Sequence, residues 1–307
     1  MDRREFLTTV GGGMLSARIG RWGPAPGPRS TVARAKVASS LELATRAAIQ
    51  RLGGMSHFVP RGSRVVIKPN ASWARSVAVC ANTHPEVVAA IASMALEAGA
   101  ADVRIVEHAV DGQDAGVAFE ASGMKDVAAL LRIPGYPVTA GRGFVPVKIP
   151  QGLRLKSAHV IREITEADVV INVPIAKSHS VTRYTGALKN WMGIVQDRTV
   201  FHAGAQGVGG ALGHSLSIGQ CCADVHTRIR PALNVLDASR VMATNGPEGP
   251  GSVIEPGEIL ASTDPVAIDA YGCRLLGIDP RRLEVLGLAA NAGLGQRNLE
   301  QIDVVDA

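Results

Sequence analysis

The sequence predicts an α/β fold, with a mostly parallel sheet, helices on both of its faces and an irregular insertion around residues 110–165. Short runs rich in Val and Ile alternate along the chain with longer segments whose apolar residues recur at helical spacing, an order typical of parallel βαβ units. The 307 residues are 46% hydrophobic, 4% aromatic and 19% charged. This composition fits a globular core of Ala, Val, Ile and Leu and excludes a disordered chain.

The first half of the chain predicts a complete strand–helix–strand unit. Residues 39–52 have apolar residues at helical spacing and end at a Gly-Gly pair, which predicts a helix. A β-branched strand follows at 64–68, then a helix over 84–96 with Pro at its start, and a strand at 103–107. Such a unit is expected to be parallel and right-handed.

The second half of the chain repeats the alternation. The predicted elements are a strand at 168–173, a helix at about 217–228, a strand at 232–236, a strand at 258–261 and a helix at 265–276. Gly and Pro interrupt residues 110–165, which we interpret as an insertion or subdomain. We therefore expect a leader and linker over residues 1–35 and a single α/β domain over residues 36–307.

The N-terminus resembles a twin-arginine export signal. Arg3 and Arg4 precede Phe6-Leu7 and a mildly apolar stretch that ends at Ala17. A linker rich in Gly, Pro and Arg follows and closes with Ala33-Arg34-Ala35, which fits a cleavage site. The resemblance implies an exported protein, in the periplasm or cell exterior, with the twin-arginine machinery as a partner. The alternative is a basic tail on a cytoplasmic protein.

Export can be tested by conservative replacement of the arginine pair. Changing both Arg3 and Arg4 to Lys is expected to block export of a reporter that must fold before it crosses the membrane. The measurement is the periplasmic reporter signal, compared with that of the unchanged leader. An unchanged signal in the double variant would leave only the basic-tail interpretation.

Charge and motif content exclude several classes of function. Residues 1–35 carry six Arg against one Asp and one Glu, so most of the formal charge of +5 lies there and the body is close to neutral. A nucleic-acid-binding body is therefore not supported. No apolar run reaches the roughly 18 residues of a membrane span. Dinucleotide-binding, P-loop, zinc-protease and serine-hydrolase motifs are also missing.

The four cysteines indicate neither a zinc ribbon nor an iron–sulfur cluster. Cys80, Cys221, Cys222 and Cys273 form no C-x-x-C pair, so the usual metal spacing is absent. Small buried core residues are the simplest interpretation. Whether a metal is bound, and which cofactor is used, stays open from the sequence.

Polar residues follow the predicted strands where these end. In chain order they are Lys68 and Asn70, His108 after Glu107, Lys177 and His179, Asp237, and Asp264. In an open parallel sheet the carboxyl ends of the strands lie on one edge, where ligand crevices form. We therefore expect these five strand ends to build one shared site.

The segment 177–193 carries the densest functional chemistry. It holds two lysines, a histidine, hydroxyl side chains and an amide in one short stretch. Lysines supply point charges for an anion, hydroxyls orient it, and a histidine shuttles protons near neutral pH or binds a metal. The alternative is a solvated loop that leads into a helix.

Five motifs together identify the chain as resembling domain-of-unknown-function family 362 over about residues 36–295. They are VVIKPN, THPEVVAAI, INVPIAKSHSVTRYTGALKNWMG, GPEGPG and STDPVAIDAYGCRLLG. The resemblance implies α/β architecture in a largely uncharacterised family. Some members carry an attached ferredoxin-like iron–sulfur domain, for which this chain lacks the cysteines. A more remote similarity to nickel-pincer lactate racemases is not anchored by any residue-level match.

The resemblance also supplies the candidate site. The residues carried over by motif are Lys68, Asn70, Thr83, His84, Lys177, His179, Thr185, Lys189, Asn190, Asp264 and Asp269. We expect His179, Lys189 and Asp269 to be catalytic and the others to bind substrate. For three of them a structural role competes: Asp264 and His84 each precede Pro at a helix start, and Asp269 falls inside the helix predicted at 265–276.

Two classes of function fit these residues. The first is an exported enzyme that acts on a small carboxylate or phosphate in a Lys/His/Asp crevice. The second is a non-catalytic binding protein, or a carrier of a cofactor or metal, that uses the same crevice. We favour the enzyme.

Overall fold

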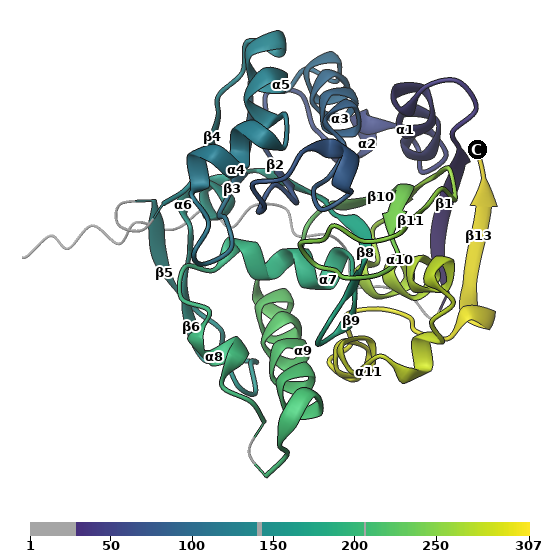
Figure 1. Ribbon diagram of the computed structural model, residues 1–307. Helices are drawn as coiled ribbons and strands as arrows, with labels where there is room; N and C mark the ends of the chain where they lie inside the picture. Colours follow the sequence, from purple (N-terminus) through teal and green to yellow (C-terminus); the bar gives the residue numbers. More distant parts are fainter. Residues whose placement is uncertain (1–28, 140–142, 206) are drawn as a thin grey trace, which may run out of the picture.

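An eleven-stranded mixed sheet forms the centre of the molecule, with the strand order β13-β1-β12-β10-β7-β2-β3-β4 along its main path (Figure 1). The structure is a computed structural model that describes residues 29–139, 143–205 and 207–307. The short strands β8, β9 and β11 attach beside β10, and β5 and β6 form a separate two-stranded sheet.

The strands have the following bounds. They are β1 Ser30–Lys36, β2 Arg64–Pro69, β3 Asp102–Glu107, β4 Gly135–Pro137, β5 Phe144–Lys148, β6 Ser157–Ile161, β7 Val169–Val173, β8 Ile175–His179, β9 Arg183–Thr185, β10 Leu233–Met242, β11 Val253–Ile254, β12 Glu258–Ser262 and β13 Ile302–Asp306.

The α-helices are α1 Leu41–Gln50, α2 Met55–Phe58, α3 Pro85–Glu97, α4 Ala115–Ala121, α5 Met124–Leu131, α6 Arg162–Glu166, α7 Ala187–Asn190, α8 Thr199–His202, α9 Gly210–Arg228, α10 Pro265–Gly272 and α11 Glu284–Asn291. Short 3₁₀ turns are η1 Val77–Val79, η2 Trp191–Ile194, η3 Cys273–Leu276, η4 Pro280–Arg282 and η5 Leu299–Gln301.

Alternate residues of the central strands face two separate cores. Val65 and Ile67 of β2 are buried with residues of α1, α3 and α5, whereas Val66 is buried with residues of α7, α9, α10 and α11. Successive side chains of a strand point to opposite faces, so a strand with both faces covered is apolar throughout. In Figure 1, α1 and α3 lie above the sheet and α9 and α11 below it. The predicted α/β class with helices on both faces is confirmed.

The elements predicted from periodicity are present. Strand β2, helix α3 and strand β3 form the expected unit, with β2 and β3 paired in parallel. The caps follow from the residues: the Ser40 side chain accepts a hydrogen bond from Leu43 N at the start of α1, and Pro85 occupies the first turn of α3. Helix α9 begins earlier than the predicted 217, at Gly210.

Residues 110–165 are more regular than expected. Helices α4 and α5 form there, and β4 extends the main sheet in parallel with β3. Of the strands in the described ranges, only β5 and β6 lie outside the main sheet. The Gly and Pro of β4 are tolerated because an edge strand needs fewer ladder hydrogen bonds than a central one.

The expected linker also ends earlier than residue 35. Ser30–Lys36 is strand β1, which pairs in parallel with β13 and antiparallel with β12, and Ala33 and Ala35 are buried. A cut after Ala35 would remove most of a strand inside the sheet, so the structure does not support a domain boundary there. The twin-arginine residues lie outside the described part of the chain, and export stays a prediction.

One strand runs opposite to expectation. Strands β2, β3, β7 and β10 are parallel, but β12 is antiparallel to β10, with Ser262 opposite Asn234. The end of β12 therefore lies at the edge where β10 begins. The predicted ends of β2, β3 and β7 share an edge. Asp237 lies inside β10 at the level of that edge, and the end of β12 that leads to Asp264 lies at the opposite edge.

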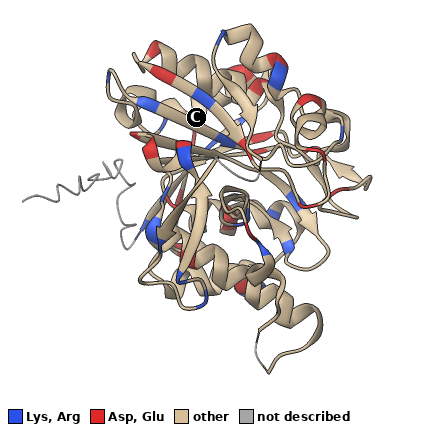
Figure 2. Cartoon of the chain, turned by 90° about the vertical axis from the view of Figure 1, so that its left-hand side faces the viewer, with Lys and Arg blue, Asp and Glu red and all other residues tan. Residues whose placement is uncertain are grey.

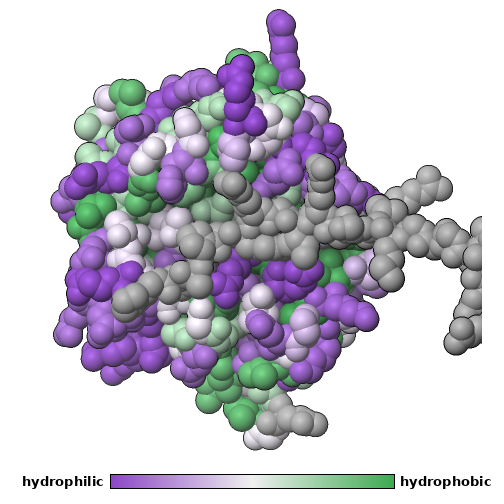
Figure 3. All heavy atoms as spheres, turned by 180° about the vertical axis from the view of Figure 1, so that it is seen from behind, coloured by the Kyte–Doolittle hydropathy of each residue, from purple (hydrophilic) through white to green (hydrophobic). Residues whose placement is uncertain are grey.

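Charged and apolar residues are mixed in the two views of Figures 2 and 3. Lys and Arg are interspersed with Asp and Glu in Figure 2, and the face in Figure 3 is mainly hydrophilic with smaller apolar groups between. Within the described ranges, none of the helices is both long and apolar enough to cross a bilayer.

Candidate functional site

A cavity of about 190 Å³ opens at the carboxyl ends of β2 and β8, with α7 and η2 along its wall. Liquid water occupies about 30 Å³ per molecule, so the cavity has room for roughly six waters or one small organic molecule. Its walls include apolar side chains from Trp73, Val110, Met192 and Pro247. The location matches the general rule for ligand sites in open α/β sheets.

Seven predicted site residues line this cavity. They are Lys68, Asn70, Lys177, His179, Thr185, Lys189 and Asn190. The β8–β9 hairpin brings several together: Lys177 and His179 lie two residues apart on one face of β8, and Thr185 pairs directly with Lys177 across the ladder. Gly186 then leads into α7, which carries Lys189 and Asn190.

Two predicted residues support the cavity without lining it. The Thr83 hydroxyl donates to Val173 O at 2.7 Å and accepts from Asn70 N at 3.0 Å, which holds the end of β2 against β7. His84 is the N-cap of α3, where its Nδ1 accepts from Glu86 N, while its own backbone N–H donates to Asp237. Asp237, predicted to follow a strand, lies inside β10, which continues to Met242, and its carboxylate holds the start of α3.

Asp264 and Asp269 lie elsewhere as well. Asp264 caps α10 by accepting from Val266 N and Ala267 N at 2.8 Å each, at the opposite edge of the sheet, so the capping interpretation describes its contacts. Asp269 accepts from Ala187 N at 2.6 Å and from Leu188 N at 2.9 Å. It fixes the start of α7 from behind the cavity and acts on the site only through that helix.

Arg198 is the main cavity residue that the sequence pattern missed. Its guanidinium donates to Ala109 O at 2.7 Å and to Val195 O at 3.3 Å, and its side chain is 4% exposed. It follows no strand, so the strand-end rule could not find it; its closeness in sequence to segment 177–193 was the available signal. His202 and Asp111 also line the cavity.

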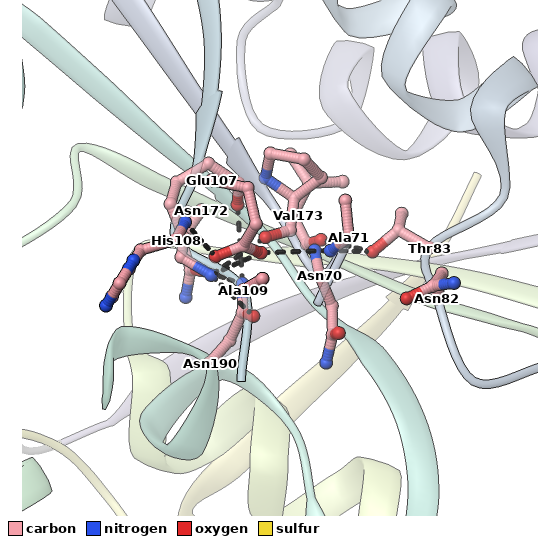
Figure 4. Close-up of polar contacts among 12 residues, drawn as sticks. Asn70, Ala71, Asn82, Thr83, Glu107, His108, Ala109, Asn172, Val173 and Asn190 are labelled. Carbon is pink, nitrogen blue, oxygen red and sulfur yellow. Dashed lines mark hydrogen bonds and ion pairs between the residues drawn. The ribbon is translucent and has the colours of Figure 1, made fainter. Parts of the chain in front are cut away.

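A buried ion pair forms the floor of the cavity. Lys68 Nζ donates to Glu107 Oε2 at 2.9 Å, and both side chains are about 1% exposed. Glu107 also accepts from Ala71 N and His108 N at 2.9 Å each (Figure 4). The pair requires a glycine beside it, because a Cβ at Gly193 would lie 2.6 Å from Lys68 Nζ.

Three asparagines extend this network under the cavity. Asn190 Oδ1 accepts from Lys68 Nζ at 3.0 Å, and its Nδ2 donates to Asn172 Oδ1 at 2.8 Å. Asn172 Nδ2 in turn donates to Asn234 Oδ1 at 2.9 Å. The chain of hydrogen bonds ties α7 to β7 and β10, so Asn190 is held in place by the sheet.

The other cations of the cavity form no ion pair with a carboxylate among the described residues, although Asp111 and Glu107 lie close enough to Arg198 to favour its charged form. Lys177 is 1% exposed; its Nζ donates to Ala81 O and lies 5.7 Å from the centre of the Trp73 ring. Lys189 is partly exposed and forms no hydrogen bond or ion pair with the described residues. Arg198 bonds only to backbone carbonyls in this part of the chain. Buried cations without an ion-paired counter-charge are costly, so the cavity favours an anion.

Burial and neighbouring positive charges lower the pKa values of Lys177 and Lys189. Burial, followed by the positive charge of Lys189, holds the pKa of Lys177 well below its usual range. Burial also lowers the pKa of Lys189 to about 8, with smaller contributions from Arg198 and Lys68. An anion in the cavity would oppose both effects, because opposite charge stabilises the protonated amine.

His179 is neutral and has a defined tautomer. Its Nδ1 accepts from Val181 N at 3.0 Å and Thr182 N at 3.2 Å, so the ring proton sits on Nε2. Burial and the two neighbouring lysines lower its pKa to about 2. His179 therefore offers the cavity an N–H donor and does not form an imidazolium at physiological pH, unlike the proton shuttle expected from sequence.

Two oxygen atoms of lining residues lack partners, and no metal-binding cluster accompanies them. Asn70 Oδ1 and Thr185 Oγ1 are buried without a hydrogen bond. In the described ranges no three His, Cys, Asp or Glu side chains gather closely enough to hold a metal ion.

Comparisons with known proteins find a family of unknown function and a relative of this chain. The family described as Domain of unknown function (DUF362) matches residues 65–274. A thylakoid-associated protein of Synechocystis sp. is 32% identical over 259 residues, which span 84% of this chain and 76% of that protein.

One solved structure is similar to this chain in fold alone. The lactate racemase apoprotein of Thermoanaerobacterium thermosaccharolyticum is 12% identical with a TM-score of 0.50, over 82% of this chain and 57% of that one. A Thermotoga maritima protein is 12% identical with a TM-score of 0.47, over 84% of this chain and 60% of that one. This chain thus spans less than two thirds of either neighbour, and both matches leave its chemistry open.

Proposed function

This chain belongs to the DUF362 family of unknown function, and we propose that it is an enzyme that binds a small organic anion, a carboxylate or phosphate, in the strand-end cavity. One observation carries the proposal. Four cationic side chains, those of Lys68, Lys177, Lys189 and Arg198, line one small cavity, and among the described residues only Lys68 has a carboxylate partner.

The roles of the side chains follow from their contacts. Lys177 and Arg198 are fixed by backbone carbonyls, so they hold the anionic group in one position. The Nε2–H of His179 donates a further hydrogen bond to it. Lys189 is the reacting group, because it lines the cavity without a hydrogen-bond or ion-pair partner among the described residues. Its pKa of about 8 also leaves it available both as a cation and as a free amine at physiological pH.

Loss of the Lys189 amine should separate ligand binding from folding. Lys189→Ala removes no hydrogen bond among the described residues, so the melting temperature without ligand should stay close to that of the wild type. A charge-assisted hydrogen bond contributes about 1.5–3 kcal/mol, so anion affinity should fall more than about tenfold. The measurement is a thermal-shift screen of small carboxylates and phosphates, followed by calorimetric titration of the ligands it finds.

The exposed Lys156 provides the matched control for that screen. Lys156→Ala should bind every ligand as the wild type does. A ligand that stabilises the wild type and Lys189→Ala equally binds outside the cavity. Turnover of a bound anion by the wild type would decide between an enzyme and a non-catalytic binder, which uses the same contacts without chemistry.

The affinity of the wild-type protein for the anion should fall as the pH rises through about 8. In the free protein the Lys189 ammonium loses its proton with a pKa of about 8, and binding an anion then requires proton uptake. Above that pH the affinity should decrease by up to tenfold per pH unit. Calorimetric titrations at pH 7, 8 and 9 on wild type and Lys189→Arg measure this: the arginine keeps its charge, so the ratio of the two affinities isolates Lys189. A constant ratio would contradict the assignment.

A further inference from the structure

We propose that Lys189 is a nucleophile that forms a Schiff base with the carbonyl carbon of a small 2-oxo carboxylate held in the cavity. This inference rests on the proposed anion site and names the class of molecule that would react there. It begins with the contrast between Lys189 and the other cations of the cavity.

Among the described residues that line the cavity, Lys189 is the lysine whose amine has no hydrogen-bond or ion-pair partner. Lys68 is held by Glu107, Asn190 and a backbone carbonyl, and Lys177 donates to Ala81 O. Lys189 lines the same cavity from α7 but has no hydrogen-bond or ion-pair partner among the described residues. An amine without partners can approach a substrate carbon, whereas an amine held by two or three acceptors cannot leave them without cost.

The carboxylate of the substrate has its own binding groups. Lys177 and Arg198 are held in place by backbone carbonyls and supply charge, and His179 supplies an N–H. These donors position the carboxylate, and the Lys189 ammonium adds positive charge to the site, so the neutral fraction of Lys189 is available to react. A carbonyl next to that carboxylate would then lie near the Lys189 amine. Holding the two reacting groups together in one cavity makes their reaction effectively unimolecular.

Burial and neighbouring positive charges keep part of Lys189 as the neutral amine, which is the form that attacks a carbonyl carbon. Burial and the charges of Arg198 and Lys68 lower the pKa of Lys189 to about 8, and a desolvated lysine beside other cations is a recognised activated nucleophile. Trp73, Val110 and Met192 contribute apolar wall that limits the water around the amine.

The reaction balances without a co-reactant. The lone pair of neutral Lys189 Nζ forms a C–N bond to the carbonyl carbon, and one amine hydrogen moves to the former carbonyl oxygen to give a carbinolamine. The C–O bond then breaks, and the second amine hydrogen leaves with that hydroxyl as water. The product is the imine. The buried Thr185 Oγ1 and Asn70 Oδ1 lack partners and are suited to accept a hydrogen bond from the carbinolamine hydroxyl.

Reductive trapping tests the proposal directly. The purified protein is incubated with glyoxylate, pyruvate or 2-oxobutanoate in the presence of cyanoborohydride, and the adduct is located by intact mass and peptide mapping. We expect one reduced adduct per chain, on Lys189, with a rate that rises with pH through about 8. Propionate, which has the carboxylate but no carbonyl, should slow the labelling.

Variants separate this proposal from anion binding itself. Lys189→Arg keeps the charge and should bind pyruvate but form no adduct, whereas Lys156→Arg should be labelled like the wild type. Labelling spread over surface lysines, or equal labelling of Lys189→Arg, overturns the proposal. Thermal stabilisation by a 2-oxo acid without any adduct overturns the Schiff base and leaves the anion site standing. If no carboxylate or phosphate binds at all, the proposed function fails first.

Discussion

Replacing Glu107 by alanine is expected to destabilise the protein by about 3–5 kcal/mol, because it leaves Lys68 as a buried cation without a counter-charge. The Lys68 side chain is inaccessible to solvent, and its other acceptors are neutral oxygens of Pro69 and Asn190. Two backbone N–H groups, those of Ala71 and His108, would also lose their acceptor. Chemical denaturation at pH 7 measures the change.

The stability deficit of Glu107→Ala should shrink as the pH rises. Burial already lowers the pKa of Lys68 from its ordinary 10.5, against the opposing effect of Glu107, so removing Glu107 lowers it further. Between that lowered pKa and 10.5 the unfolded chain binds more protons than the folded one, and stability therefore increases with pH.

The double variant Lys68→Met with Glu107→Gln is the control for this prediction. It removes both charges at similar volume, so it should be more stable than Glu107→Ala. If Glu107→Ala unfolds at the same denaturant concentration as the wild type, the Lys68–Glu107 ion pair does not contribute to the stability of the protein.

Asp269→Asn is expected to cost both stability and anion affinity, although Asp269 does not line the cavity. Its two carboxylate oxygens accept from Ala187 N and Leu188 N, and the amide nitrogen of Asn would face one of those donors. An unpaired buried donor costs about 1–3 kcal/mol. Anion affinity should fall as well, because the loosened α7 carries Lys189.

The loss of stability in Asp269→Asn should be larger at low pH than at high pH. Burial raises the pKa of Asp269 from 3.8 to about 7 against the effect of its two N–H donors. A folded pKa above the unfolded one gives stability that is complete below about pH 4 and is lost as the pH rises through about 7. Asn does not titrate, so the deficit of Asp269→Asn relative to wild type should be larger at pH 5 than at pH 8.

Denaturation curves of the wild type and Asp269→Asn at pH 5 and pH 8 test this pH dependence. The contributions of other titrating groups to stability cancel when the two proteins are compared at the same pH. Asp264→Asn is the matched comparison, because that carboxylate also caps a helix but lies at the other edge of the sheet. It should lower stability without changing the affinity for the anion. Equal effects of both variants on affinity would remove the link between Asp269 and the site.

Local sequence determined the class of fold and much of the cavity. The Val and Ile runs at 64–68, 103–107 and 168–173 form central strands because both faces of those strands are covered, which requires apolar residues throughout. Since three of the central strands run in parallel, residues that follow them converge by topology alone. This is why Lys68, Asn70 and the segment that begins at Lys177 meet in one cavity.

Tertiary structure decided the roles of individual residues. The direction of β12 is set by its pairing with β10 and β1, which no local pattern encodes, and this sends Asp264 away from the site. Glu107 becomes the partner of Lys68 only because β3 lies beside β2.

The chemistry of His179 and Lys189 likewise depends on their surroundings. The same imidazole that would shuttle protons in water is a neutral donor here, since its Nδ1 is occupied by the hairpin turn and two lysines lie near. The residue types follow from the sequence, but their charge states depend on burial and on neighbours that only the folded chain brings together.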